Sequence, residues 1–175
     1  EVIEACKKHL PQIAASFDDP RLELIVGDGI EYAANAAPES YDLILVDGSD
    51  PVGPAEGLFS VKFFNDCANA LKPGGILLTQ GESPKFNDKA FAELHHTIAD
   101  IFGKQNTYVS LFFVPTYPTG MWSFQYGVKG DLNMKQLPNP EAVRAFTEKH
   151  NLRYYNEDIH TASFATPGFV KELLR

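Results

Sequence analysis

Two aspartates stand where a short apolar segment of this chain ends. The residues Leu43–Val46 are all aliphatic, Asp47 follows them at once, and Asp50 comes three positions later, next to the turn-rich Pro51–Pro54. A short apolar run bounded by turn residues is typical of a buried strand in a parallel sheet. Ligands of open α/β sheets bind outside the carboxyl ends of the strands, so both carboxylates are expected at a ligand-binding edge. The plainer alternative is that the two aspartates only cap a turn.

The overall composition narrows the class of protein. The chain has 175 residues, 44% of them hydrophobic, which suits one domain with a sizeable core. No apolar run reaches the length of a membrane span, and no signal-peptide pattern opens the chain, so we expect a cytoplasmic protein that does not bind a membrane. Cys6 and Cys67 are interpreted as reduced residues on apolar helix faces, without the spacing of a metal site.

The charge of the chain is unevenly distributed. Residues 1–60 hold 12 acidic and 3 basic side chains, a balance of −9, whereas residues 61–175 hold 11 and 12, a balance of +1. An acidic region of this kind attracts cations and disfavours nucleic acid as a partner. An ordinary solvated acidic face would have the same composition, so both interpretations remain open.

Hydrophobic periodicity predicts strands that alternate with helices. Strands are expected at Leu22–Val26, Asp42–Val46 and Ile76–Gln80, and helices at Val2–Leu10, Ile30–Ala36, Phe64–Leu71 with Ser60 as N-cap, and Phe91–Phe102, where His95 and His96 should be exposed. The aromatic runs Thr107–Val114 and Met121–Val128 predict an antiparallel hairpin. A helix should run from Asn139 to His150 and a last one from Thr166 to Arg175, with Asn151–Ala165 irregular.

This order of elements predicts an α/β fold. Strands that alternate with helices form a parallel sheet with right-handed crossovers. An incomplete parallel sheet with a C-terminal antiparallel hairpin resembles the Rossmann-like fold of S-adenosylmethionine-dependent transferases, although a fold alone does not assign a function.

The segment Asp47–Glu56 resembles the signature of spermidine synthases, a family of polyamine aminopropyltransferases. That signature usually reads Asp-Ser-Ser/Thr-Asp-Pro-x-Gly-Pro-Ala-Glu, and Gly48 is the one departure from it. Further stretches match the family in the same order along essentially the whole chain: Gly27–Gly29, Gln80–Glu82, Pro115–Gly120 and Tyr154–Phe164.

The resemblance implies a reaction. In that family an aminopropyl group moves from decarboxylated S-adenosylmethionine to putrescine, giving spermidine and methylthioadenosine. The decarboxylated S-adenosylmethionine is a co-substrate, so no separate cofactor and no metal are expected. An alkylamine with a pKa of about 10.4 is mostly protonated, and removing its proton costs about 4 kcal/mol near neutral pH. A carboxylate in a dry pocket can accept that proton, since desolvation raises the pKa of an acid and lowers that of an amine.

The resemblance also implies roles for individual residues. Asp47 is the expected base, and Asp50 is a second acceptor that orients the attacking amine. Asp28 would accept a hydrogen bond from the adenine amino group, with Gly29 beside it. The walls of the adenine pocket would be Pro54, Ala55 and Leu58, although ordinary loop packing explains these as well.

Residues near the hairpin are expected to contact the polyamine. The hydroxyl of Tyr117 could bond to it and its ring could face a cation, unless this tyrosine only caps the core. Gln80 is expected to be a polar contact in the same crevice, and Glu82 to reach the distal ammonium. Trp122 is interpreted as a core residue.

Several features of the family have no counterpart in these residues. The Gly-rich loop after the first strand, the acidic residue that ends the second strand and the N-terminal β-domain are all missing, so we expect the chain to be the C-terminal part of the catalytic domain. Dimers are usual in the family, so a homodimer is expected. Two other functions stay open: a Rossmann-like methyltransferase, and an inactive fragment that serves only in folding or oligomerisation.

Overall fold

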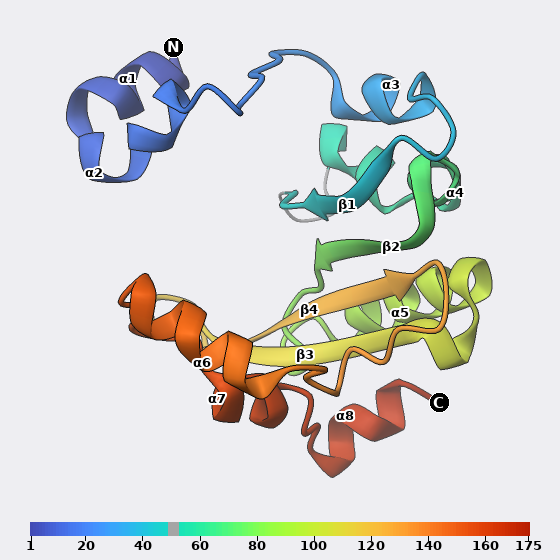
Figure 1. Ribbon diagram of the computed structural model, residues 1–175. Coiled ribbons are helices and arrows are strands. Elements are labelled where there is room, and N and C mark those ends of the chain that lie inside the picture. The colour runs from blue at the N-terminus through green and yellow to red at the C-terminus, as the bar shows by residue number, and fades with distance from the viewer. Residues whose placement is uncertain (49–52) are drawn as a thin grey trace.

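One mixed sheet organises the molecule (Figure 1). The computed structural model describes residues 1–48 and 53–175, and for residues 53–55 it describes only the backbone. In this part of the chain the sheet has the order β1-β2-β4-β3, formed by β1 (Tyr41–Val46), β2 (Leu71–Gln80), β3 (Thr107–Phe113) and β4 (Met121–Val128). β1 and β2 are parallel, and β4 is antiparallel to both β2 and β3. The predicted α/β class, the parallel pair and the terminal hairpin are confirmed.

Helices precede, connect and follow the strands. The α-helices are α1 (Val2–His9), α2 (Pro11–Ala14), α3 (Gly29–Ala34), α4 (Val61–Ala70), α5 (Asp88–Phe102), α6 (Pro140–Lys149), α7 (Glu157–Ser163) and α8 (Gly168–Leu173), and the short 3-10 helices are η1 (Ala15–Asp18), η2 (Gly53–Phe59) and η3 (Lys104–Asn106). Figure 1 shows α1 and α2 apart from the sheet, at the end of an extended segment.

The main core lies between the sheet and the two helices α4 and α5. It includes Phe64 of α4, Ile98 of α5 and Leu77 of β2, each fully shielded from solvent. Because successive side chains of a strand point to opposite faces, Leu78 and Gln80 of β2 lie on the other face of the sheet, where they line a cleft. The helices therefore stabilise one face and leave the other available to a ligand.

Both ends of α4 are capped by side chains. Ser60 Oγ accepts a hydrogen bond from the backbone nitrogen of Phe63 at 3.2 Å, so the predicted N-cap is confirmed. Lys129 Nζ, which follows β4, donates to the carbonyl oxygens of Ala68 at 3.0 Å and Leu71 at 2.7 Å. These bonds satisfy carbonyl groups at the helix end and join α4 to the sheet.

Two predictions about secondary structure are wrong. Leu22–Val26 is not a strand: its side chains are exposed, and no described segment pairs with it. An apolar, β-prone segment still needs a neighbouring strand to hydrogen-bond its backbone. The second error lies in Asn151–Ala165, which contains α7; Asn156 starts this helix by accepting a hydrogen bond from the backbone nitrogen of Ile159 at 2.8 Å.

No helix in residues 1–48 and 53–175 is long and apolar enough to cross a membrane.

Candidate active site

Asp47 and Gln80 lie side by side at the carboxyl ends of β1 and β2. The parallel register pairs Val46 of β1 with Thr79 of β2, so the residue after each of them lies at the same edge. Asp47 is exposed there, whereas Gln80 is buried. Both residues therefore lie at the carboxyl ends of neighbouring strands, and their roles in binding and catalysis stay predictions.

A large cleft of about 1070 Å³ opens at this edge. Its lining residues come from β1, β2 and the hairpin, and they are Leu45–Gly48, Leu78, Gln80, Phe112, Val114, Tyr117, Pro118, Trp122 and Phe124. Asp47, Gln80 and Tyr117, which sequence reasoning singled out separately, therefore line one space. The lining combines a few charged and hydrogen-bonding groups with a larger apolar surface.

Aromatic rings form one wall of the large cleft. Tyr117 and Trp122 meet edge to face with ring centroids 4.8 Å apart, and Phe112 stacks on Phe124 at 4.1 Å. The expectation that Trp122 is a core residue is wrong, since its half-buried ring lines the cleft. The strand alternation of Trp122, Phe124 and the hairpin partner Phe112 would have indicated this shared face.

The side chain of Gln80 is held by other protein groups. Its Oε1 accepts hydrogen bonds from Trp122 Nε1 at 2.9 Å and from the backbone nitrogen of Glu82 at 3.1 Å. Its Nε2 donates to Glu82 Oε1 at 3.0 Å. Gln80 is thus a fixed polar group in the cleft wall.

Glu82 does not face the cleft. Its side chain is fully buried, and its second carboxylate oxygen accepts a hydrogen bond from Asn87 Nδ2. The expectation that Glu82 reaches a distal ammonium is therefore wrong, because Gln80 and Asn87 already occupy its oxygens. No local pattern indicated this burial, since a glutamate near a strand end is usually exposed.

A second, mostly apolar cavity of about 360 Å³ adjoins the first. Gly29, Leu58 and Tyr32 line it together with the segment Leu43–Gly48, of which Leu45–Gly48 also border the large cleft. Asp47 therefore belongs to both spaces. Of the residues predicted to surround an adenine ring, Gly29 and Leu58 lie at this cavity.

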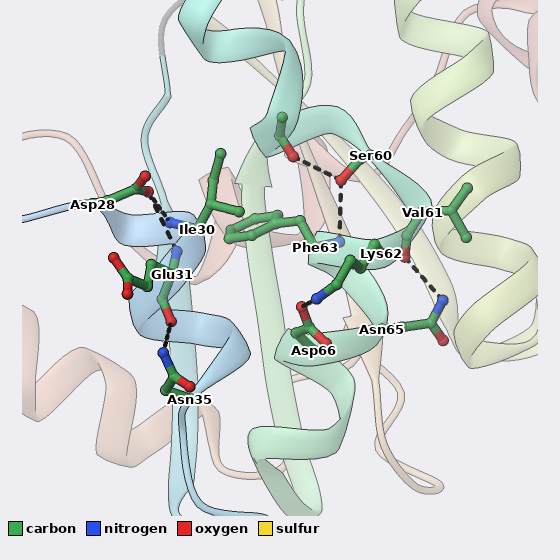
Figure 2. A network of polar contacts seen from close by, with 11 residues as sticks. Asp28, Ile30, Glu31, Asn35, Ser60, Val61, Lys62, Phe63, Asn65 and Asp66 are labelled. Carbon is green, nitrogen blue, oxygen red and sulfur yellow. Dashed lines mark hydrogen bonds and ion pairs between the residues drawn. The ribbon is translucent and has the colours of Figure 1, made fainter.

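Asp28 lies at the N-terminus of α3 and outside both cavities. Its Oδ1 accepts hydrogen bonds from the backbone nitrogens of Ile30 at 2.8 Å and Glu31 at 3.3 Å. Figure 2 shows this cap, and beside it Ile30 and Phe63 filling the space between α3 and α4. The carboxylate is exposed and borders a smaller pocket with Glu23 and Gly27. Its role toward adenine stays a prediction.

The side chains of three predicted site residues lie outside what the structure describes. Asp50 is not among the described residues, and Pro54 and Ala55 belong to the first part of η2, residues 53–55, of which only the backbone is described. Their proposed roles remain predictions from the sequence.

Histidines and cysteines form no metal-binding cluster in the described ranges 1–48 and 53–175.

The two adjacent histidines of α5 differ in burial. His95, expected to be exposed, lies on the buried face of α5, while His96 beside it is exposed. Sequence periodicity placed His95 wrongly because the apolar face of α5 is wider than its aliphatic residues alone suggest.

Comparisons with known proteins agree on one family. The family model described as "Spermine/spermidine synthase domain" matches residues 1–136. A polyamine aminopropyltransferase of Desulforudis audaxviator is 43% identical over 99% of this chain, and one of Caldicellulosiruptor saccharolyticus is 38% identical over 99%. The chain spans only about 60% of the length of these relatives.

Solved structures show the same similarity. A spermidine synthase in complex with the transition state analogue AdoDATO superposes with a TM-score of 0.89 at 40% identity, covering 99% of this chain and 57% of that one. The spermidine synthase from Thermotoga maritima gives a TM-score of 0.83 at 37% identity, with 99% and 56% covered.

Proposed function

Because the chain belongs to the spermine/spermidine synthase family, we propose that it forms part of an enzyme that transfers an aminopropyl group from decarboxylated S-adenosylmethionine to putrescine. The products are spermidine and methylthioadenosine. The observation that supports this most strongly is the shared cleft: Asp47, Gln80 and Tyr117 border one space at the carboxyl ends of β1 and β2.

The chemistry requires a neutral amine beside an electrophilic carbon. The leaving group is a neutral thioether, so the protonated amine is the main obstacle, at about 4 kcal/mol near neutral pH. In this proposal Asp47 first holds the ammonium and then accepts its proton. The aromatic wall of the cleft would reduce the water around that proton transfer.

The two adjoining cavities suit two substrates. The nucleoside end of decarboxylated S-adenosylmethionine would occupy the small apolar cavity, and the alkyl diamine would lie along the aromatic wall of the large cleft. Asp47 borders both spaces, so the attacking nitrogen and the reacting carbon would meet beside it. Holding the reactants in line would supply much of the remaining rate enhancement.

Tyr117 would help to bind the diamine. Its ring packs against Trp122 in the cleft wall and is nearly half exposed, so a ring face and a hydroxyl can meet an ammonium group. Asp28, Gly29, Asp50 and Pro54 keep the binding roles that the family resemblance implies. Decarboxylated S-adenosylmethionine acts as a co-substrate, and a homodimer in the cytoplasm stays part of the proposal.

Exchange of Asp47 for Asn tests the assignment of the base. In the protein expressed from its full reading frame, Asp47→Asn should lower kcat by about 100-fold or more, since general base catalysis contributes about 10² to 10⁴-fold. Methylthioadenosine release with putrescine as acceptor measures the reaction. Asp42→Asn is a matched control on the same strand: Asp42 is exposed and pairs with Lys72 at 2.8 Å. Normal turnover by Asp47→Asn would refute the base assignment.

The same assay separates the methyltransferase alternative. Aminopropyl transfer releases methylthioadenosine, whereas methyl transfer from S-adenosylmethionine releases S-adenosylhomocysteine. If the wild-type protein released S-adenosylhomocysteine and no methylthioadenosine, the proposed function would be overturned.

A further inference from the structure

Glu82 is an unusual residue for the interior of this fold. Its side chain is 0% exposed, and no described Lys, Arg or His lies within ion-pairing distance of it. Among the described residues, only the amide groups of Gln80 and Asn87 donate to its carboxylate. A buried carboxylate without a cation is costly compared with an apolar side chain of similar size, so a contribution other than packing is indicated.

The backbone at Glu82 is strained and firmly held. Its φ is +65°, a region that residues other than glycine rarely adopt. Ser123 Oγ donates to the carbonyl oxygen of Glu82 at 2.8 Å, and the carbonyl of Ser123 accepts from the nitrogen of Gly81 at 2.8 Å. A Cβ on Gly81 would lie 2.6 Å from Gln125 Cγ, so only glycine allows this close approach to β4.

These contacts determine which way the amide of Gln80 faces. The indole nitrogen of Trp122 and the backbone nitrogen of Glu82 are donors only, so the atom that meets both must be Oε1 of Gln80. The carboxylate of Glu82 is placed to accept from Nε2. An amide flipped by 180° would set donor against donor at two positions. The orientation of the Gln80 amide therefore follows from the hydrogen-bonding character of its neighbours, without knowledge of any hydrogen position.

The amide therefore offers only one kind of group to the cleft. Both lone pairs of Oε1 are used, and one of the two Nε2 hydrogens is bonded to Glu82. The second Nε2 hydrogen remains. Gln80 lines the same cleft as the acceptor carboxylate of Asp47, so the group that its amide offers there is a donor, and an ammonium group, which only donates, is not its ligand.

We propose that Glu82 is a positioning residue that keeps Gln80 turned as a hydrogen-bond donor toward the cleft. This inference rests on the proposed function for its catalytic consequence. The donor is available to a carboxylate oxygen of Asp47, which lines the same cleft. Of these two residues, Asp47 meets the ammonium and accepts its proton, and the N–H of Gln80 holds the carboxylate of Asp47 in the position from which it does so.

Single substitutions of Glu82 test the positioning. Glu82→Ala removes the acceptor and should lower kcat about tenfold while KM for putrescine changes less than about threefold, because the misplaced amide affects the reacting arrangement. Glu82→Gln should recover most of that loss, since its Oε1 can still accept from Gln80 while Asn87 turns its amide. Glu93→Ala, which removes an exposed carboxylate from α5, controls for the change in charge. Wild-type kinetics for Glu82→Ala would overturn the proposal.

A reciprocal exchange tests the donor itself. In the double variant Gln80→Glu, Glu82→Gln, residue 80 still accepts from the Trp122 indole and from the backbone nitrogen of residue 82. The new amide at position 82 donates to residue 80 and accepts from Asn87, so every bond of the network is kept. Only the group facing the cleft changes, from an N–H to a carboxylate oxygen. We expect a melting temperature near that of the wild type and a kcat/KM for putrescine at least about tenfold lower. Wild-type kcat/KM in this variant would refute the donor.

A spectroscopic measurement separates this inference from the proposed function. The indole N–H resonance of Trp122, assigned by its loss in Trp122→Phe, reports the hydrogen bond to Gln80. It should move upfield in Glu82→Ala and stay near the wild-type position in Glu82→Gln. An unchanged resonance in Glu82→Ala would show that Glu82 does not hold Gln80, whether or not the protein forms methylthioadenosine.

Discussion

At the scale of single residues, the two cysteines differ in the environment of their sulfur atoms. Cys67 is 1% exposed within α4, and burial, with a smaller effect of the Asp66 charge, raises the pKa of its thiol to about 12. Cys6 lies half-buried on α1, and both cysteines are free. The thiolate is the reactive form, so Cys67 behaves as a small apolar core residue.

Alkylation should therefore discriminate between the two thiols. In the native protein at about pH 8, iodoacetamide should modify Cys6 and leave Cys67 unmodified, because water and reagent do not reach its sulfur. Peptide mass spectrometry measures the extent at each site. In denaturant both should react alike, which serves as the control, and rapid native labelling of Cys67 would contradict its burial.

At the scale of elements, α4 connects the Asp47 region to the sheet. Its N-terminus follows η2 directly, and its C-terminus leads without a loop into β2. Ser60 caps one end, and Lys129 bonds the carbonyls at the other. The position of β2 beside β1, on which the cleft depends, is thus tied to the capping of one helix.

Removing the N-cap should weaken the fold measurably. Ser60→Ala loses the acceptor for the Phe63 nitrogen, and we expect a loss of about 1 kcal/mol in the free energy of unfolding. Ser60→Thr keeps the hydroxyl and is the matched control. Urea unfolding measures both, and a Ser60→Ala protein within about 0.3 kcal/mol of wild type would show that the cap contributes little.

At the scale of the whole molecule, His95 links folding to pH. Burial is the main cause that lowers its pKa from 6.5 to about 4, with smaller effects of His96 and Lys104. In the part of the chain that the structure describes, its Nδ1 has no hydrogen-bond partner, so no neighbouring acceptor stabilises a protonated His95 in the folded state. Between these two pH values the unfolded chain binds more protons than the folded one, and the free energy of unfolding falls as the pH falls.

This linkage predicts an acid-sensitive fold. From about pH 7 to about pH 5, His95 should contribute a loss of roughly 1 to 2 kcal/mol, allowing for partial solvent screening. His95→Phe removes the titrating group and should reduce the difference between the two pH values by that amount. Urea unfolding at both pH values measures it. The exposed neighbour supplies the control His96→Gln, and an unchanged pH dependence in His95→Phe would contradict the prediction.

Much of the architecture could be predicted because its signals are local. The Ser60 cap, the aromatic hairpin and the Asn139 helix start depend on a few adjacent residues, and each was confirmed. The same holds for the edge position of Asp47, which follows from one short apolar strand. Leu22–Val26 failed because strand formation requires a partner that local composition does not reveal.

By itself, the sequence determined the α/β class, the parallel pair with its hairpin and the family, since these depend on short-range patterns and on motifs that keep their order along the chain. The tertiary structure alone decided that Glu82 and His95 are buried, that Trp122 lines the cleft and that Gln80 offers a donor. Each of these depends on a group from a distant segment: Trp122 lies 42 positions after Gln80, and its indole nitrogen determines which end of the amide faces it.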